Sequence, residues 1–210
     1  MSGLSGSGLP AAKLEDERYR APVSESETVF DGKVWDVRRD RFELDGSTIV
    51  REYQEHPGAV AVLAEDDEGR ILLIKQYRHP IGYRDWELPA GLLDIDGEAP
   101  DAAARRELAE EADLQASEWS PLCDFFSSPG GSSERITVYL ARGLTPTAKP
   151  FDRTAEEAGI ELRWVPRAEV VDAILDGRLR NAILMIAVLS DHSGAADSRA
   201  PRAGAARART

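Results

Sequence analysis

The chain of 210 residues has almost no cysteine, because Cys123 is the only one. A single cysteine excludes an intramolecular disulfide, and this favours a reducing, cytoplasmic setting. Cys123 stands in an apolar run, so we interpret it as a small buried residue rather than as a catalytic thiol. The sequence also lacks an apolar run long enough to cross a bilayer, and its first residues lack the pattern of a secretory signal. We therefore expect no membrane partner.

Basic residues are also scarce relative to acidic ones. The chain has 26 Lys and Arg against 38 Asp and Glu, which gives a formal net charge of −12. This balance argues against nucleic acid as a partner, because the phosphate backbone would be repelled without a strong basic patch. Clustered carboxylates are, in contrast, what hard cations such as Mg²⁺ require.

The composition divides the chain into four parts. Residues 1–24 are rich in Gly, Ser and charge, and we expect a disordered leader there. Residues 25–57 are expected to form an N-terminal ribbon, and residues 58–190 the main domain. Residues 191–210 are interpreted as a disordered tail whose arginines are solvated; a weak contact with an acidic surface is the alternative.

The pattern of apolar residues predicts an α/β (α+β) fold. Asp45-Gly46 is a strong hairpin signal, so residues 34–50 should form an antiparallel β-ribbon. Short apolar runs predict further strands, at 59–64, 71–77, 86–88, 122–126, 136–141 and 160–165. Helical patterns occupy residues 98–112, 167–176 and 181–189. This order is typical of a mixed sheet sandwiched between helices.

Two glutamates on the first of these helices have the spacing of a metal site. Glu107 and Glu111 are four residues apart and share one helical face, where their like charges repel. A divalent cation would convert this repulsion into coordination by oxygen ligands. Gly91 precedes the helix in a Pro–Gly loop that could offer a carbonyl ligand and approach phosphates closely. The plain alternative is a solvated acidic helix face.

The longer string resembles the Nudix box, G-x5-E-x7-R-E-U-x-E-E-x-G-U, in which U is aliphatic. The matching residues are Gly91, Glu98, Arg106, Glu107, Leu108, Glu110, Glu111 and Leu114. There are two departures from the pattern: six residues rather than five separate Gly91 from Glu98, and Asp113 replaces the final glycine. An insertion in a loop costs little, and Asp tolerates a left-handed conformation better than most residues.

This resemblance implies a Nudix fold and a hydrolase that uses Mg²⁺, or alternatively Mn²⁺ or another divalent ion, to split a diphosphate. It implies that Glu107 and Glu111 are metal ligands together with the carbonyl of Ala90, and that Glu110 assists a second or third ion. Glu98 would bond to Arg106 or hold an outer metal water. Arg106 would orient the carboxylates for catalysis.

Segments outside the box resemble the ADP-ribose pyrophosphatases of actinobacterial type. Residues 76–80 and 86–94 are similar to segments before the box in that subgroup. Pro129 follows Leu114 by fifteen residues, as a proline typically does there, and the loop through Glu134 is similar to a Pro-Gly-x-Ser-x-Glu segment. The resemblance covers residues 29–189 and implies that ADP-ribose is split into AMP and ribose 5-phosphate.

In this subgroup the catalytic base lies outside the box, on an acidic loop after the long strand. The corresponding loop spans about residues 145–158 and contains Glu156-Glu157. The resemblance makes Glu157 the base, with Glu156 as the second candidate and a solvated loop charge as the plain alternative. A carboxylate on a loop can activate water once substrate has bound.

Related enzymes are homodimers in which the N-terminal sheet swaps across and helps to form the adenine pocket. Phe30 or Trp35 would stack on one side of the adenine, and Arg51 on the other. Arg78 and Arg84 would meet phosphate or the terminal ribose, and Glu87 would accept a hydrogen bond from the adenine amino group. The plain alternatives are a core role for Trp35 and surface charge for the arginines.

The amino-acid sequence leaves other functions open. Another nucleoside diphosphate sugar, FAD or a dinucleoside compound would require the same chemistry. A non-catalytic sensor of ADP-ribose or NAD is a second class of protein, although the intact glutamates of the box favour an enzyme. A third alternative is a structural acidic domain, whose stability would not depend on Mg²⁺.

Overall fold

A computed structural model describes residues 14–151 and 159–192. Most of the predicted leader, the pair Glu156-Glu157 and the tail from residue 193 therefore lie outside the described residues. Among the helices that are described, none combines the length and apolar character that a bilayer crossing requires.

The N-terminal ribbon is confirmed, and it has three strands. β1 (Val23–Phe30), β2 (Asp36–Leu44) and β3 (Ser47–Glu55) form an antiparallel sheet in that order. The turn between β2 and β3 has φ of 52° at Asp45 and 75° at Gly46, as the hairpin signal predicts. β1 begins at Val23, inside the range 1–24 that we expected to be disordered.

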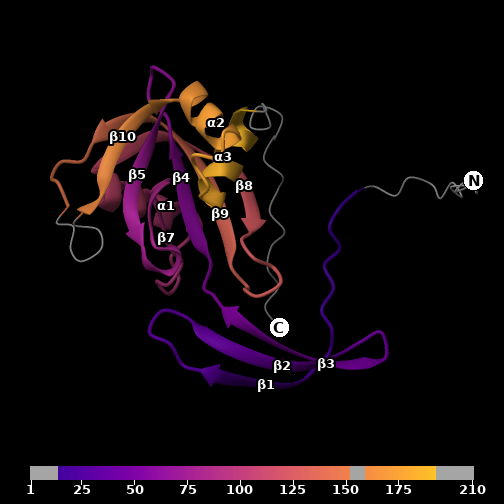
Figure 1. Ribbon diagram of the computed structural model, residues 1–210. Coiled ribbons are helices and arrows are strands. Elements are labelled where there is room, and N and C mark those ends of the chain that lie inside the picture. The colour runs from indigo at the N-terminus through magenta and orange to yellow at the C-terminus, as the bar shows by residue number, and fades with distance from the viewer. Residues whose placement is uncertain (1–13, 152–158, 193–210) are drawn as a thin grey trace, which may run out of the picture.

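The predicted mixed sheet is also confirmed, but it is divided into two parts (Figure 1). The four-stranded part has the order β7-β4-β9-β8, with β4 parallel to β9 and the other neighbours antiparallel. The three-stranded part has the order β10-β5-β6. The strands are β4 (Ala59–Ala64), β5 (Arg70–Arg78), β6 (Tyr83–Glu87), β7 (Ala90–Leu92), β8 (Leu114–Phe126), β9 (Arg135–Pro146) and β10 (Glu161–Pro166).

Three α-helices cover this sheet, as the sequence predicts. They are α1 (Pro100–Ala112), α2 (Arg167–Leu175) and α3 (Ala182–His192), and a short 3-10 helix η1 (His79–Ile81) follows β5. α1 begins with Pro100 in its first turn, where a missing N–H leaves no hydrogen bond unmade. Asp113 ends the helix with φ 55° and ψ 34°, so it takes the left-handed conformation expected for the final glycine of the box.

The central strand β4 explains why helices lie on both faces. All six of its residues are buried, and successive side chains point to opposite sides of the sheet. One set packs with α2 and α3, and the other packs with α1 (Figure 1). The continuous apolar run of β4 is therefore the mark of a strand between two cores. Cys123 lies in β8 and is only half-buried, so the prediction that it is buried was too strong.

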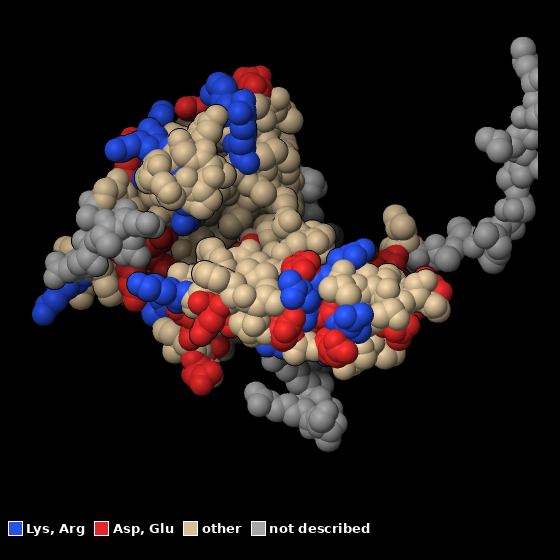
Figure 2. All heavy atoms as spheres, turned by 60° about the horizontal axis from the view of Figure 1, so that its bottom comes forward, with Lys and Arg blue, Asp and Glu red and all other residues tan. Residues whose placement is uncertain are grey.

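The N-terminal sheet lies apart from the helices and touches the main domain at the end of β3 (Figure 1). Gln54 donates its backbone N–H to the Gly131 carbonyl at 2.9 Å and accepts from the Ser133 N–H at 3.0 Å. Figure 2 views the molecule from this side and shows acidic and basic side chains interspersed along the sheet. Cross-strand ion pairs account for this pattern: Arg39 with Glu27 and Glu52, and Arg41 with Glu25.

Candidate active site

Arg106 joins three of the four box glutamates. Its guanidinium makes two hydrogen bonds to the Glu98 carboxylate, at 3.0 and 2.9 Å. It also donates to Glu107 at 2.6 Å and to Glu110 at 3.1 Å. Of the two alternatives given for Glu98, a bond to Arg106 or a contact with an outer metal water, the structure shows the bond to Arg106. Because one rigid guanidinium holds three carboxylates, Arg106 orients them as the box pattern implies.

The hydrogen bonds within this cluster shift the pKa values of Arg106 and Glu98. The hydrogen bonds to Glu98 are the main reason why the pKa of the Arg106 guanidinium is raised above its ordinary value. The same bonds hold the pKa of the Glu98 carboxyl below its ordinary value. The ion pair therefore favours the charged form of both groups.

The Gly91 loop passes directly over the Glu107 carboxylate. A Cβ added to Gly91 would collide with the carboxylate carbon and both oxygens of Glu107. A side chain at this position would displace the Glu107 carboxylate, which is one reason for the glycine in the box. Glu107 is buried in consequence, with 9% of its surface exposed.

Glu111 is fixed by the same loop. Its carboxylate accepts the backbone N–H of Ala90 at 2.8 Å, and only 4% of its surface is exposed. Ala90 itself is held in β7 opposite Ala61 of β4. The loop and the helix are thus bonded together at the position that the sequence assigns to the metal. The role of the Ala90 carbonyl stays a prediction.

The extra residue between Gly91 and Glu98 does not displace the site. The loop closes in a turn, in which the Glu98 N–H donates to the Ile95 carbonyl at 3.1 Å and Gly97 has φ of 77°. Glu98 still reaches Arg106 with both carboxylate oxygens. The insertion is absorbed in the turn, as expected for a loop.

The four glutamates fit a divalent cation by their chemistry. Three of the four carboxylates pair with the Arg106 guanidinium, and Glu111 accepts the Ala90 N–H instead. The cluster therefore has a formal excess of three negative charges, and two of its members, Glu107 and Glu111, are buried. Hard cations with oxygen ligands are the ions that such an excess favours. Within residues 14–151 and 159–192, no three Asp, Glu, His or Cys side chains are arranged to hold an ion on their own. Metal coordination by these residues therefore stays a proposal.

Two of the predicted substrate contacts are brought together as an ion pair. Arg78 donates two hydrogen bonds to the Glu87 carboxylate, both at 2.7 Å. Glu87 is 3% exposed, and Gln76 donates to it at 3.5 Å. The pair links the end of β5 to the end of β6, so each residue fixes the other before any substrate binds.

The predicted adenine contacts lie on exposed parts of the chain. Phe30 is 63% and Trp35 44% exposed, so the alternative that Trp35 belongs to the core is wrong. Arg51 is exposed on β3, and its guanidinium donates to the Val50 carbonyl at 2.8 Å. Arg84 is exposed on β6. The structure brings none of these residues into contact with the four glutamates of α1 and its loop.

A residue that sequence reasoning missed connects the N-terminal sheet with the loop of Pro129 and Glu134. The His56 ring lies 5.5 Å from the Trp35 ring, centroid to centroid, and its Nε2 lies 3.4 Å from a Glu134 carboxylate oxygen. Its Nδ1 accepts the Gly58 N–H at 3.0 Å, which leaves Nε2 as the protonated nitrogen. No sequence pattern marks this contact, because its partners are far apart in the chain. Pro129 itself is exposed.

The fold and the carboxylate cluster together define a Nudix domain. The sequence model described as the NUDIX domain matches residues 55–185, which is more than half of the chain. The chain therefore belongs to the Nudix family of hydrolases, whose members generally use divalent metal ions.

Two similar proteins and one similar solved structure are named here for comparison. The chain is 46% identical to an ADP-ribose pyrophosphatase of Mycobacterium tuberculosis, over 84% of this chain and 86% of that protein. It is 43% identical to an ADP-ribose pyrophosphatase of Bacillus subtilis, over 57% of this chain and 64% of that protein. A solved structure of an ADP compounds hydrolase superposes with a TM-score of 0.71, covering 86% of this chain and 96% of the other. At 22% identity this last likeness supports the fold alone.

Proposed function

We propose that the protein hydrolyses the diphosphate bond of ADP-ribose, with Mg²⁺, to AMP and ribose 5-phosphate. The observation that carries the proposal is the cluster in which Arg106 and the Gly91 loop hold the box glutamates at α1. The two relatives named ADP-ribose pyrophosphatase support the substrate, because one of them is similar over most of both chains.

In this proposal one P–O bond of the P–O–P bridge breaks while water forms a new P–O bond. Glu107 and Glu111 would hold the cation, and Arg106 would keep the carboxylates aligned. Glu157, outside the described residues, accepts the proton from the attacking water. When bound, a divalent ion withdraws charge from the diphosphate and makes water easier to deprotonate. Mg²⁺ is the proposed ion because all the side-chain ligands are carboxylate oxygens.

The N-terminal sheet and nearby loops are proposed to bind the rest of the substrate. Phe30 or Trp35 would stack on adenine with Arg51 opposite, which their exposure permits. Arg78 and Arg84 would contact phosphate or the terminal ribose, and Glu87 would accept a hydrogen bond from the adenine amino group. Further proposed substrate contacts are Gly91, Pro129 and Glu134. The Arg78–Glu87 ion pair holds both of these side chains in place.

We also propose a homodimer that forms through the N-terminal sheet, in a cytoplasmic setting. The sheet and its connecting loop expose several large apolar side chains: Val23, Val29, Phe30, Val34, Trp35 and Val50. Exposed apolar side chains that are concentrated in one small sheet support an interface there. The proposed partner is a second copy of this chain.

Light scattering should therefore give twice the chain mass of 23.0 kDa. Phe30→Ser should shift the equilibrium toward the monomer, because it removes an exposed aromatic group from the sheet. Leu175→Ser is the matched control, since Leu175 is 72% exposed on α2, away from that sheet. A mass of one chain for the wild type at all concentrations would refute the dimer.

A substrate panel with Mg²⁺ tests the activity. ADP-ribose should have the highest kcat/KM among ADP-ribose, other nucleoside diphosphate sugars, FAD and dinucleoside compounds. Hydrolysis in ¹⁸O-water should place the label on one of the two products and thereby identify the phosphorus attacked. If ADP-ribose were the poorest substrate of the panel, the subgroup assignment would fail; binding without turnover would indicate a sensor.

A further inference from the structure

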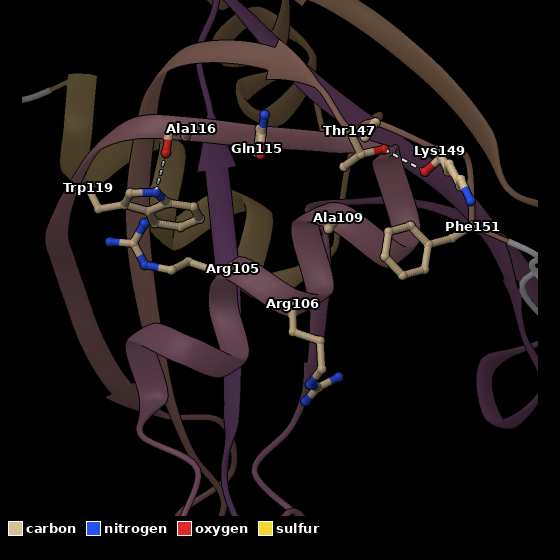
Figure 3. Close-up of a pocket in the computed structure, with 10 residues that line it drawn as sticks. Arg105, Arg106, Ala109, Gln115, Ala116, Trp119, Thr147, Lys149 and Phe151 are labelled. Atoms are coloured by element: carbon tan, nitrogen blue, oxygen red, sulfur yellow. Dashed lines mark hydrogen bonds between the residues drawn. The ribbon is translucent and has the colours of Figure 1, made fainter.

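An open cavity lies on the exposed side of α1 (Figure 3). Its volume of about 620 Å³ is within the usual range for a small-molecule site. Three segments line it: α1, the first part of β8 and the chain that follows β9. None of the four box glutamates lines it; Arg106 does, but its guanidinium is bonded to three of those glutamates. The cavity is therefore a neighbour of the carboxylate cluster and not a part of it.

The wall formed by the chain after β9 is held beside α1. The Thr147 N–H donates to the Asp113 carbonyl at 2.9 Å, and the Phe151 N–H donates to the Asp113 carboxylate at 2.7 Å. Between these bonds, the Thr147 hydroxyl donates to the Lys149 carbonyl at 2.9 Å (Figure 3). Hydrogen bonds at both ends order this wall, so a ligand would have little of it left to immobilise.

Two aromatic rings stand at opposite ends of the cavity. Figure 3 shows Trp119 at one end and Phe151 at the other, with Ala109 of α1 between them. The Trp119 indole N–H donates to the Ala116 carbonyl at 3.0 Å, so Trp119 offers a ligand only its apolar surface. Phe151 is 43% exposed. An exposed aromatic ring that lines a cavity is a surface on which a planar ring can stack.

The charges around the cavity have one sign. Arg105, Arg106 and Lys149 line it, and no lining residue is acidic, although the chain has a net charge of −12. Arg105 lies 4.6 Å from the centre of the Trp119 ring. Neither Arg105 nor Lys149 forms an ion pair with a residue that the structure describes. Two cations are thus left to attract an anion, and a cationic ligand would be repelled.

Two neutral polar side chains complete the lining. The exposed Gln115 amide offers both donors and an acceptor, and none of the described residues bonds to it. The Thr147 hydroxyl has given its hydrogen to the Lys149 carbonyl, so its lone pairs remain as acceptors. A heterocycle with donors and acceptors along its edge has partners here.

We propose that this cavity binds a nucleoside monophosphate. The base stacks on the exposed ring of Phe151 and bonds at its edge to Gln115 or Thr147, and the phosphate pairs with Arg105 and Lys149. A phosphate alone would leave the aromatic ring unused, and a neutral nucleoside would leave both cations unused. The site needs no divalent cation and lies outside the carboxylate cluster, so it is additional to the proposed site of hydrolysis.

Binding of AMP in the presence of a chelator tests the site, because no divalent cation can then link the phosphate to the box glutamates. Each of the four tryptophans gives one indole signal in ¹⁵N NMR spectra, and Trp119→Phe identifies the signal of Trp119. That signal should shift saturably with AMP, with an affinity at least about 10-fold above those for adenosine and ribose 5-phosphate, which each lack one half of the ligand. Equal affinity for AMP and either of these compounds would overturn the proposed ligand. A shift of the Trp35 signal without one of Trp119 would place AMP at the N-terminal sheet and overturn the site.

Substitutions separate the contacts to the two halves of AMP. Arg105→Gln combined with Lys149→Gln should weaken AMP binding by at least about 10-fold, as the loss of charge-assisted hydrogen bonds does, while adenosine binds as before. Phe151→Leu removes the exposed ring but keeps the backbone bond to Asp113. It should weaken AMP and adenosine alike, by at least about 5-fold. AMP binding at wild-type strength in either variant would overturn the proposed arrangement.

Lys75→Gln combined with Arg163→Gln is the matched control. It removes two positive charges from β5 and β10, at residues that do not line the cavity, and should leave AMP binding unchanged. Equal weakening in this control would mean that net charge alone attracts AMP, and would overturn the site. Melting temperatures show that each variant folds. Because binding is measured without a divalent cation and without turnover, a failure to hydrolyse ADP-ribose would refute the proposed function and leave this site intact.

Discussion

Glu107→Gln should abolish Mg²⁺-dependent hydrolysis of ADP-ribose, with kcat lowered by at least about 100-fold. Even groups that merely orient metal ligands cost about 10- to 100-fold in affinity or activity when removed, and Glu107 is proposed to be a ligand. Glutamine keeps the shape of the side chain but removes the negative charge. The substituted side chain still fits under the Gly91 loop, which passes directly over this carboxylate.

The Glu107→Gln variant should also lose most of the stabilisation of the fold by Mg²⁺. Mg²⁺ at 100 times its Kd should stabilise the wild type by about 2.7 kcal/mol, and the Glu107→Gln variant by much less. The melting temperature without metal shows whether the variant folds. Glu118→Gln, on the exposed part of β8, is the matched control and should behave as the wild type in both measurements. Full Mg²⁺ stabilisation of Glu107→Gln would remove Glu107 from the proposed ligands.

The sequence allowed the central part of this site to be predicted because its geometry is local. Glu107, Glu110 and Glu111 lie on one helix with Arg106, so their spacing alone determines which of them are neighbours. The left-handed Asp113 follows in the same way from its position after the last helical turn. β4 is equally clear, since a fully buried strand leaves a continuous apolar run.

Features that depend on contacts between residues far apart in the chain cannot be recognised from a local sequence pattern. β1 was placed partly in the leader because every residue in it is exposed, so it has no alternation of apolar and polar residues. Its backbone pairing and the ion pair of Glu27 with Arg39 hold it to β2 instead. The contact of His56 with Glu134 joins residues far apart in the chain. The hydrogen bond from the Phe151 N–H to the Asp113 carboxylate depends on where β8 begins and β9 ends. Register between strands determines such contacts, and periodicity within one segment carries no information about it.

Glu157→Gln should also lower kcat strongly, by about 10²- to 10⁴-fold, the usual contribution of a general base. The resemblance to the ADP-ribose pyrophosphatases assigns the base to this position, outside the described residues. Loss of the base leaves proton removal to solvent hydroxide. The kcat of the variant should therefore rise with pH through a range in which the wild type is constant. Glu156→Gln is the adjacent control and should lose much less activity.

The two glutamate variants should differ in what they leave intact. Glu157→Gln should keep the full Mg²⁺-dependent rise in melting temperature and a KM close to that of the wild type, because the proposed ligands are untouched. Glu107→Gln should lose that rise, because its carboxylate lies in the cluster that Arg106 and the Gly91 loop hold. A Glu156→Gln variant with the larger loss would move the base by one residue. Loss of Mg²⁺ stabilisation in Glu157→Gln would instead make Glu157 a ligand, since a base that acts only on water contributes nothing to metal affinity.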